Sequence, residues 1–403
     1  MKYSKSVKEA MKQLDIKKLR PKQGQAISSI LNGHDTMVIA PTSFGKSILY
    51  LIPAIIQSDK LTIVVEPLLA LMHDQVKYLR KHQIAAAYLD HMQTEKEQSD
   101  ILDCVQSGEI HILFVSPERL CRLPFQMAIQ DISIGMVVVD ECHCVISWGS
   151  TFREDYLHIG AFVDSLPKHP VVVAVTATDA PQDREHIMAL LSMRSEPKCF
   201  AYSLYRSNLT FLIKPVESRK EKRRKLQKLL KKYHANTTLI FCATKAGAEA
   251  VAEDLKALFP GDVAVYHSRE KKAEKAILAG KKHVIVATTA SSMGVDIRNV
   301  DLVIHFDLPK SLEEYYQQAG RGGRDGQHSR SILLYDPADY QRNYGLLYQI
   351  SDKEARKRAV EQLNQMKELC DEKHRCLVKM MLVFLGDSPR KNCRYCTNCQ
   401  KAR

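Results

Sequence analysis

The first feature of this sequence with recognisable chemistry is the pair Lys46-Ser47, which lies between an apolar run and an amphipathic run. Residues 41–47 spell Pro-Thr-Ser-Phe-Gly-Lys-Ser, after a predicted strand and before a predicted helix. The run nearly fits the phosphate-binding pattern G-x-x-x-x-G-K-[ST], with Ala40 at the first glycine position. Backbone N–H groups of such a loop surround the phosphates, Lys46 reaches the β- and γ-phosphates, and Ser47 gives its hydroxyl to Mg²⁺. The predicted nucleotide-binding residues of the loop are Thr42, Ser43, Phe44, Gly45, Lys46 and Ser47.

Two acidic residues supply the partner that such a loop needs. Asp140 and Glu141 directly follow the apolar run 136–139. A carboxylate at the carboxyl end of a strand, in the same domain as a phosphate loop, is positioned to hold Mg²⁺. We expect Asp140, with Ser47, to hold the magnesium ion and Glu141 to position or deprotonate the attacking water. The alternative is an exposed acidic turn, but the phosphate loop upstream favours nucleotide hydrolysis.

Four of the eleven cysteines are concentrated near the end of the chain and predict a metal site. Cys-x₂-Cys-x₂-Cys places three thiolates on one short loop, and a helix brings the fourth. A Cys₄ set is typical of structural Zn²⁺. An iron–sulfur cluster is the alternative, because the same spacing occurs there. The predicted ligands are Cys376, Cys393, Cys396 and Cys399.

The elements that must position these residues follow an alternating pattern. Short apolar, β-branched runs are separated by amphipathic stretches, which indicates a parallel sheet covered by helices. Ten such runs fall into two series of five: 36–40, 61–65, 111–115, 135–139 and 171–176, then 237–242, 262–266, 283–288, 302–306 and 331–335. The α/β pattern therefore predicts two parallel-sheet domains in tandem, followed by a small helical metal-binding module. We expect them to span residues 1–208, 209–342 and 343–403.

Composition narrows the partner and the compartment. The chain has 403 residues and a formal net charge of +13, which suggests a polyanionic partner, with nucleic acid first. The basic stretch 219–232 is expected to be a helix with one apolar stripe and a solvated basic face. Scattered cysteines in odd number argue against a secreted disulfide framework and favour a reducing cytosol. Neither a signal peptide nor a run of about 18 apolar residues is present, so no membrane partner is expected.

Residues 140–153, Asp-Glu-Cys-His-Cys-Val-Ile-Ser-Trp-Gly-Ser-Thr-Phe-Arg, resemble the DExH box and aromatic-rich loop of the RecQ family of superfamily 2 helicases. Further segments resemble the family's other motifs in the same order: 19–23, 66–76, 115–120, 176–178, 239–242, 293–296 and 316–326. The resemblance covers roughly residues 15–400. It implies two RecA-like domains that bind ATP and Mg²⁺, and it selects zinc for the four cysteines.

The resemblance also implies roles for individual residues. Arg20 and Gln23 fall in the adenine-reading motif, and a glutamine amide has both a donor and an acceptor for the base edge. Arg324 is the expected arginine finger, with Arg321 as the second choice. The expected DNA-binding residues are Ser116, His143, Trp148, Phe152, Arg153 and Thr288. Trp148 favours an exposed stacking platform over core packing, whereas Ser116 and Thr288 fit ordinary strand-end polar groups equally well.

Departures from the family pattern qualify these expectations. Ser43 and Phe44 stand where the family usually carries glycine. The sequence stops four residues after Cys399, so a short form lacking the winged-helix and HRDC domains is expected. The resemblance implies an ATP-dependent 3′–5′ DNA helicase acting in repair and recombination. A translocase or annealing factor, a non-enzymatic DNA-binding scaffold and an RNA helicase are the alternatives.

The expected partners follow from the same resemblance. They are single-stranded DNA and tailed or forked duplexes, with single-strand-binding or repair proteins as further candidates. A monomer in the bacterial cytosol or nucleoid is expected.

Overall fold

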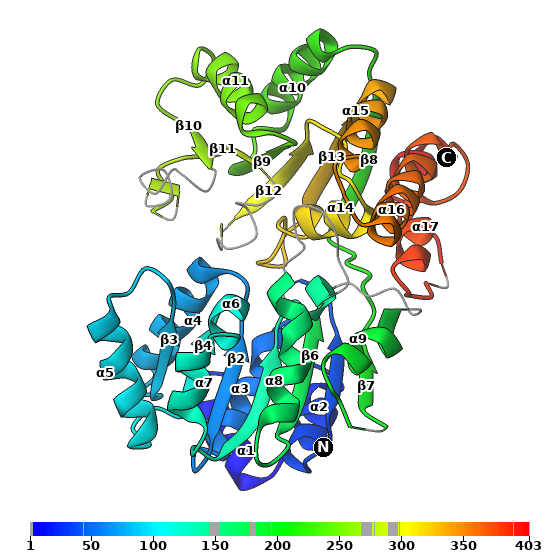
Figure 1. Cartoon of the computed structure of the whole chain (residues 1–403). Helices are drawn as coiled ribbons and strands as arrows, with labels where there is room; N and C mark the ends of the chain where they lie inside the picture. Colours follow the sequence, from blue (N-terminus) through cyan, green and yellow to red (C-terminus); the bar gives the residue numbers. More distant parts are fainter. Residues whose placement is uncertain are drawn as a thin grey trace. The chain divides into compact units, whose positions relative to one another are not determined.

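The computed structural model describes residues 3–42, 44–145, 154–177, 183–194, 196–266, 276–277, 279–288, 297, 299–389 and 391–402 (Figure 1). The described residues form two compact units. The first ends at Tyr202 and the second begins at Ser203. The helical segment that carries the cysteines belongs to the second unit.

The first unit is built on a seven-stranded sheet in the order β3-β4-β2-β5-β6-β1-β7. All of its strand pairs are parallel, so the carboxyl ends of the strands share one edge. The strands are β1 (Thr36–Ile39), β2 (Leu61–Val65), β3 (Ala86–Leu89), β4 (Ile112–Val115), β5 (Ile134–Val139), β6 (Val171–Thr176) and β7 (Lys198–Ala201). Every residue of β1, β2 and β4 is buried, which explains their continuous apolar sequences.

Helices cover this sheet and connect its parallel strands. They are α1 (Lys5–Gln13), α2 (Gln23–Leu31), α3 (Lys46–Ile56), α4 (Leu69–Lys81), α5 (Glu95–Gln106), α6 (Pro117–Leu120), α7 (Leu123–Ile129), α8 (Ile159–Ser165) and α9 (Arg184–Leu190), with 3₁₀ turns η1 (Cys142–Val145) and η2 (Glu154–His158). Short-range capping contacts mark the starts of several of these helices. Thr94, for example, starts α5 in a capping box with Glu97.

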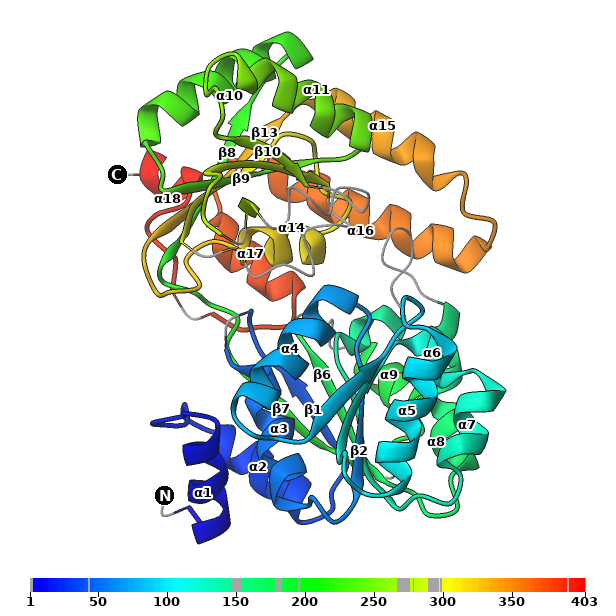
Figure 2. The same cartoon turned by 90° about the vertical axis from the view of Figure 1, so that its left-hand side faces the viewer.

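The second unit contains a six-stranded sheet in the order β10-β11-β9-β12-β13-β8, again with every pair parallel. The strands are β8 (Leu209–Pro215), β9 (Thr237–Cys242), β10 (Val263–Tyr266), β11 (Val284–Thr288), β12 (Val300–His305) and β13 (Ser329–Tyr335). The helices are α10 (Arg219–Tyr233), α11 (Lys245–Lys256), α14 (Leu312–Ala319), α15 (Pro337–Leu347), α16 (Lys353–Asp371), α17 (Leu377–Phe384) and α18 (Thr397–Lys401). Figure 2 shows α10 and α11 on one face of this sheet and α14, α16 and α17 on the other.

The predicted fold class is confirmed. Two α/β units, each with a sheet of parallel strands, are followed by a helical segment that carries the four clustered cysteines. All ten predicted strands are present, and three further strands, β3, β7 and β8, were not predicted. The edge strand β7 is mostly exposed, which explains why it lacks a continuous apolar run. Among the described residues, no helix is both long and apolar enough to cross a bilayer.

Helix α10 departs from its prediction at one residue. Its apolar stripe is buried and the lysines and arginines of its opposite face are exposed as expected, but the buried stripe also contains a charged residue, Lys222. The cause is a set of groups from other elements, the carboxylates of Asp307 and Asp339 and the carbonyl of Phe306, which surround the ammonium group.

Candidate nucleotide site and zinc centre

The phosphate loop connects the end of β1 to the start of α3. Gly45 precedes the helix with a φ of 84°, a left-handed conformation that favours glycine. A Cβ atom at this position would lie 3.1 Å from Cδ1 of Ile48. Lys46 and Ser47 begin α3, so the helix amino terminus faces the loop. Ser43 lies outside the described residues.

Lys46 contacts the acidic pair that follows β5. Its Nζ atom lies 3.3 Å from Oε1 of Glu141. Asp140 is buried and accepts a hydrogen bond of 2.8 Å from the backbone N–H of Glu141. The hydroxyl of Tyr50, on α3, lies 3.4 Å from the other carboxylate oxygen of Asp140. The structure therefore brings together Lys46 and the two carboxylates, Asp140 and Glu141, that the sequence predicted separately as magnesium-binding and hydrolytic residues.

A third carboxyl group, Glu66, lies at the end of the neighbouring strand β2 and was not predicted as a site residue. It is fully buried; its Oε1 accepts the backbone N–H of Leu68, while its Oε2 has no hydrogen-bond partner among the described residues. Because β2 pairs with β5 and Val65 lies opposite Val139, Glu66 and Asp140 directly follow the ends of neighbouring strands. A carboxyl residue directly after an apolar run was the sequence signal that could have identified it.

The electrostatics of this cluster are dominated by burial and by like charge. Burial raises the pKa of Asp140 to about 6, and the negative charge of Glu141 adds to the shift while Lys46 opposes it. Burial, together with Asp140 and Glu141, raises the pKa of Glu66 well above its usual value. Burial acts to lower the pKa of Lys46, but Glu141 and Asp140 outweigh it and the net shift is upward. A charged lysine thus faces several carboxyl groups that burial makes harder to ionise.

His143 connects this cluster to the end of β6. Its Nδ1 atom lies 3.3 Å from Oε2 of Glu141 and 3.1 Å from the hydroxyl oxygen of Thr176. Burial lowers the pKa of His143, so the neutral imidazole is favoured at neutral pH. Its contacts place it between Glu141 and Thr176, which fits a role in linking β6 to the candidate nucleotide site.

The segment before α2 contacts the phosphate loop directly. Gln23 is buried; its Oε1 accepts the backbone N–H of Arg20 at 2.7 Å, and its Nε2 donates to the carbonyl of Phe44 at 3.1 Å. The guanidinium of Arg20 lies over the Phe44 ring, 5.5 Å from its centroid. The predicted base reader therefore also holds the backbone of the phosphate loop.

The remaining predicted DNA-binding residues are only partly described. Ser116 is buried, and its hydroxyl accepts the backbone N–H of Arg119 at the start of α6, which is a capping role. Thr288 is buried at the carboxyl end of β11. Trp148, Phe152 and Arg153 lie outside the described residues, as do residues 178 and 293–296 of the expected motifs.

The predicted arginine fingers lie in the loop that follows α14 in the second unit. Arg321 and Arg324 are both half-buried there. Arg206 holds the backbone of the loop, because its guanidinium donates to the carbonyls of Gly320, Gly322 and Gly323 at 2.9, 3.0 and 2.6 Å. This support defines the path of the loop that carries both arginines.

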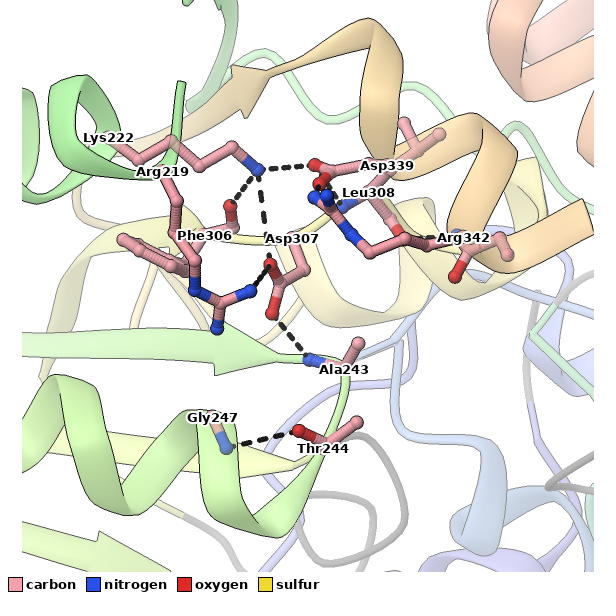
Figure 3. Close-up of polar contacts among 11 residues, drawn as sticks. Arg219, Lys222, Ala243, Thr244, Gly247, Phe306, Asp307, Leu308, Asp339 and Arg342 are labelled. Atoms are coloured by element: carbon pink, nitrogen blue, oxygen red, sulfur yellow. Dashed lines mark hydrogen bonds and ion pairs between the residues drawn. The ribbon is translucent and has the colours of Figure 1, made fainter. Parts of the chain in front are cut away.

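The strand ends of the second unit are held by the buried Lys222 (Figure 3). Its ammonium donates to the carbonyl of Phe306 at 2.6 Å, forms an ion pair with Asp339 and lies 3.9 Å from Asp307. Asp307 in turn accepts the backbone N–H of Ala243 at 2.9 Å, which joins the carboxyl ends of β9 and β12. Burial lowers the pKa of Lys222 to about 8, so the group remains charged at neutral pH.

Two arginines complete this network. Arg219 lies 3.8 Å from Asp307, and Arg342 pairs with Asp339. Asp339 also accepts the backbone N–H of Leu308 at 3.2 Å. The network fixes the segment after β12 to α10 and α15.

The four predicted metal ligands converge. The sulfur atoms of Cys376, Cys393, Cys396 and Cys399 all lie within 4.8 Å of one another. Tetrahedral zinc, with Zn–S bonds of about 2.3 Å, requires sulfur atoms roughly 3.8 Å apart, so the set fits the ion. Backbone N–H groups support the thiolates: Cys393 donates to the sulfur of Cys376 at 3.3 Å, and Cys396 donates to the sulfur of Cys393 at 3.2 Å.

Three family models match successive parts of the chain. They describe a DEAD/DEAH box helicase at residues 20–187, a helicase conserved C-terminal domain at 221–326 and a RecQ zinc-binding region at 337–400. The last of these decides among helicase families. The chain belongs to the RecQ family of superfamily 2 helicases. Use of ATP with Mg²⁺ is typical of this family, and the four cysteines form its zinc site, which removes the iron–sulfur alternative.

Individual relatives agree with this assignment. The RecQ chain is 33% identical over 393 residues to the ATP-dependent DNA helicase RecQ of Bacillus subtilis, covering 96% of this chain and 65% of that protein. It is also 33% identical over 389 residues to the enzyme of the same name from Pasteurella multocida, covering 94% and 60%. The chain thus spans less than two thirds of the length of these relatives. In fold, it is similar to the Mycobacterium smegmatis helicase Lhr bound to single-stranded DNA and AMP-PNP, with a TM-score of 0.67 at 20% identity, covering 86% of this chain and 49% of that one.

Proposed function

We propose that this RecQ-family chain is an ATP-dependent DNA helicase that unwinds duplex DNA with 3′–5′ polarity, in repair or recombination. The observation that carries the proposal is the contact between Lys46 and Glu141, beside the buried Asp140, at the carboxyl edge of the first sheet. A phosphate-binding lysine and a hydrolytic carboxylate in contact are what nucleotide hydrolysis requires. Membership of the RecQ family supports DNA as the partner and the coupling of hydrolysis to strand separation.

The residues divide the chemistry as follows. Lys46 and the loop residues Thr42, Ser43, Phe44 and Gly45 bind the phosphates, and Arg20 with Gln23 binds the adenine side. Ser47 and Asp140 would hold Mg²⁺, which neutralises charge on the phosphates when bound. Glu141 accepts the proton of the attacking water. Its contacts with Lys46 and His143 orient the carboxylate for this role. Arg324, with Arg321 as the second choice, stabilises negative charge on the transferred phosphoryl group.

DNA contacts are assigned to Trp148, Phe152 and Arg153 of the aromatic-rich loop, and to Ser116 and Thr288 at strand ends. A base stacks on an exposed indole, and a guanidinium pairs with phosphate. We assign residues 1–208 and 209–342 to the two RecA-like domains and residues 343–403 to the zinc module. A monomeric protein in the cytosol, working with single-strand-binding or repair proteins, completes the proposal.

Strand displacement tests the proposal directly. Partial duplexes with a 3′ tail, a 5′ tail or no tail are incubated with the protein, Mg²⁺ and ATP. Selective unwinding of the 3′-tailed substrate is the expected result. DNA-stimulated hydrolysis without unwinding in the same tubes would instead indicate a translocase or remodelling factor, and absence of hydrolysis would overturn the proposal.

The Trp148→Ala variant tests the assignment of the aromatic-rich loop. Loss of the stacking surface should reduce stimulation of ATP hydrolysis by single-stranded DNA about 5- to 150-fold, because base stacking contributes about 1–3 kcal/mol. Nucleotide affinity should stay unchanged. Full stimulation by DNA in this variant would show that the loop assignment is wrong.

A further inference from the structure

Tyr202 is the last residue of the first unit, and the second unit begins with the next residue. Its backbone N–H donates to the carbonyl of Ile39 at 2.9 Å, and Ile39 is the last residue of β1 before the phosphate loop. The start of the linker is therefore anchored where the nucleotide-binding loop also starts.

The side chain of Tyr202 makes two more contacts with the nucleotide site. Its ring packs against Phe44 of the phosphate loop, with centroids 4.3 Å apart and planes inclined by 40°. Its hydroxyl donates to the carbonyl of Lys22 at 3.0 Å, next to the predicted base reader Gln23. Burial raises the pKa of Tyr202 to about 12, so this hydroxyl keeps its proton and remains a donor. One side chain thus contacts both the phosphate loop and the adenine-reading segment.

The two segments that Tyr202 contacts, the phosphate loop and the segment before α2, also contact each other. The amide of Gln23 donates to the carbonyl of Phe44, and the Arg20 guanidinium lies over the Phe44 ring. Phe44 stands where the family usually has glycine, which has no side chain. The aromatic ring therefore adds a contact between the loop and Tyr202 that a glycine could not make.

The other end of the linker is anchored in the second unit. Asp387, after α17, accepts hydrogen bonds from the hydroxyl of Ser203 and the backbone N–H of Leu204 at 2.9 and 2.7 Å. Arg206 donates to the backbone of the loop that carries Arg321 and Arg324. Within five residues, the chain runs from a side chain that contacts the phosphate loop to one that holds the arginine loop.

We propose that Tyr202 is a positioning residue through which the phosphate loop and the interdomain linker influence each other. Nucleotide in the loop fixes Phe44, Phe44 fixes Tyr202, and Tyr202 sets where the linker begins. Because such coupling is reciprocal, DNA that favours one arrangement of the linker must change nucleotide affinity by the same factor. The inference rests on the proposed function, since it requires that the chain binds both nucleotide and DNA.

A coupling measurement on the full chain tests the role. The affinity for a fluorescent oligothymidylate is measured by anisotropy with and without saturating Mg²⁺–AMP-PNP, and the ratio of the two dissociation constants is the coupling factor. The expected wild-type factor is about 5- to 150-fold, the usual range for coupled sites. Tyr202→Leu, which removes the ring and the hydroxyl, should bring the factor close to one. Tyr202→Phe, which removes only the hydroxyl, should give an intermediate value.

Two further variants separate coupling from general damage. Phe44→Leu should reduce the coupling factor as Tyr202→Leu does, and the double variant should show no additional loss, because both changes remove one contact. Tyr205→Leu is the matched control, because Tyr205 lies in the same linker, is 41% exposed and should keep the wild-type factor. Thermal unfolding of each variant checks that it folds, and Tyr202→Phe carries the test if Tyr202→Leu does not.

The outcomes distinguish this inference from the proposed function. An unchanged coupling factor in Tyr202→Leu, or losses that multiply in the double variant, would overturn the role of Tyr202. A wild-type protein that hydrolyses ATP with DNA stimulation but has a coupling factor of one overturns the inference and leaves the proposed function intact. A wild-type protein that binds no nucleotide overturns both.

Discussion

Each unit contains a cluster of buried charged groups at the carboxyl ends of its strands, and the two clusters are balanced differently. In the first unit, Lys46 faces Glu66, Asp140 and Glu141. In the second unit, the carboxylates of Asp307 and Asp339 are paired with three cationic groups, which are Arg219, Lys222 and Arg342. The first cluster has an excess of carboxyl groups, whereas the second has a cation for every carboxylate.

The difference fits the proposed nucleotide-hydrolysing role of the first cluster and a structural role of the second. A buried charge is costly unless it is paired, and a complete pair holds its elements together without a ligand. The second cluster meets this condition with its own side chains, so it fixes strand ends. In the first cluster, burial raises the pKa of Glu66 and of Asp140. Such an excess of carboxyl groups is suited to a divalent cation and to accepting a proton, which are the two needs of ATP hydrolysis.

The largest expected effect is on turnover in the first cluster. Glu141→Gln preserves the size of the side chain but removes the carboxylate that we propose accepts the proton of water. General-base catalysis contributes about 10²- to 10⁴-fold, so ATP hydrolysis should fall at least about 100-fold. Steady-state hydrolysis with and without single-stranded DNA measures the change. ATP affinity, measured by equilibrium binding, is the control and should be retained, whereas turnover at the wild-type rate would refute the assignment.

The second cluster should affect stability instead. Lys222→Met leaves Asp339 buried with Arg342 as its remaining cationic partner in the network. Breaking a buried pair from one side costs about 3–5 kcal/mol, and the remaining arginine places this case near 3 kcal/mol. Denaturant unfolding of the second unit measures the loss. Lys228→Met, at an exposed position of the same helix, is the matched control and should be close to neutral.

If Lys222→Met left stability unchanged while abolishing ATP hydrolysis, the contrast between the two clusters would fail. The double variant Lys222→Met/Asp339→Leu sharpens the same point. Removal of both partners should recover part of the lost stability, because no buried carboxylate is left uncompensated at that position.

The raised pKa of Asp140 should also make the stability of the first unit depend on pH. The pKa of Asp140 is about 6 in the folded protein and near 3.8 when unfolded, so the folded state binds more protons between these values. Its contribution to stability is present below the lower value and is lost as pH rises through about 6. We therefore compare the metal-free wild type with Asp140→Asn. Between about pH 5 and about pH 7.5, the free energy of unfolding of the first unit should fall by about 1 kcal/mol more in the wild type than in the variant. Denaturant unfolding of both proteins at these two pH values measures it, and an opposite slope would contradict the raised pKa.

The smallest expected effect concerns Glu66. At a pH above the usual pKa of a glutamate, the wild type must take up a proton to bury the carboxyl group of Glu66. Glutamine has the same shape and no charge. Glu66→Gln should therefore stabilise the metal-free protein at neutral pH, by at most about 1 kcal/mol, and the gain should grow with pH. Chemical denaturation compares it with Glu109→Gln, an exposed control in the same unit. Marked destabilisation by Glu66→Gln would indicate that the ionised form is needed.

The local signals of the sequence were sufficient where one segment supplies the chemistry. The strand–loop–helix around Lys46, the acidic pair after β5 and the cysteine spacing are all set within a few residues, and apolar runs identify strands buried on both faces. The same signals failed for β7, which is an edge strand and needs no apolar run. The domain boundaries and the roles of the site residues stay predictions.

Tertiary structure decided which distant residues meet. Glu66 joins the nucleotide cluster because β2 pairs with β5, and Tyr202 reaches Phe44 because β7 pairs with β1. Helical spacing puts Lys222 on the face of Leu226 and Leu230, but only the packing of α10 places it against Asp307 and Asp339. The sequence by itself determined the class of chemistry, because residue types and short spacings define the phosphate loop and the zinc ligands. Only the fold decided the balance of charge around that chemistry, because that balance depends on which strand ends lie next to each other.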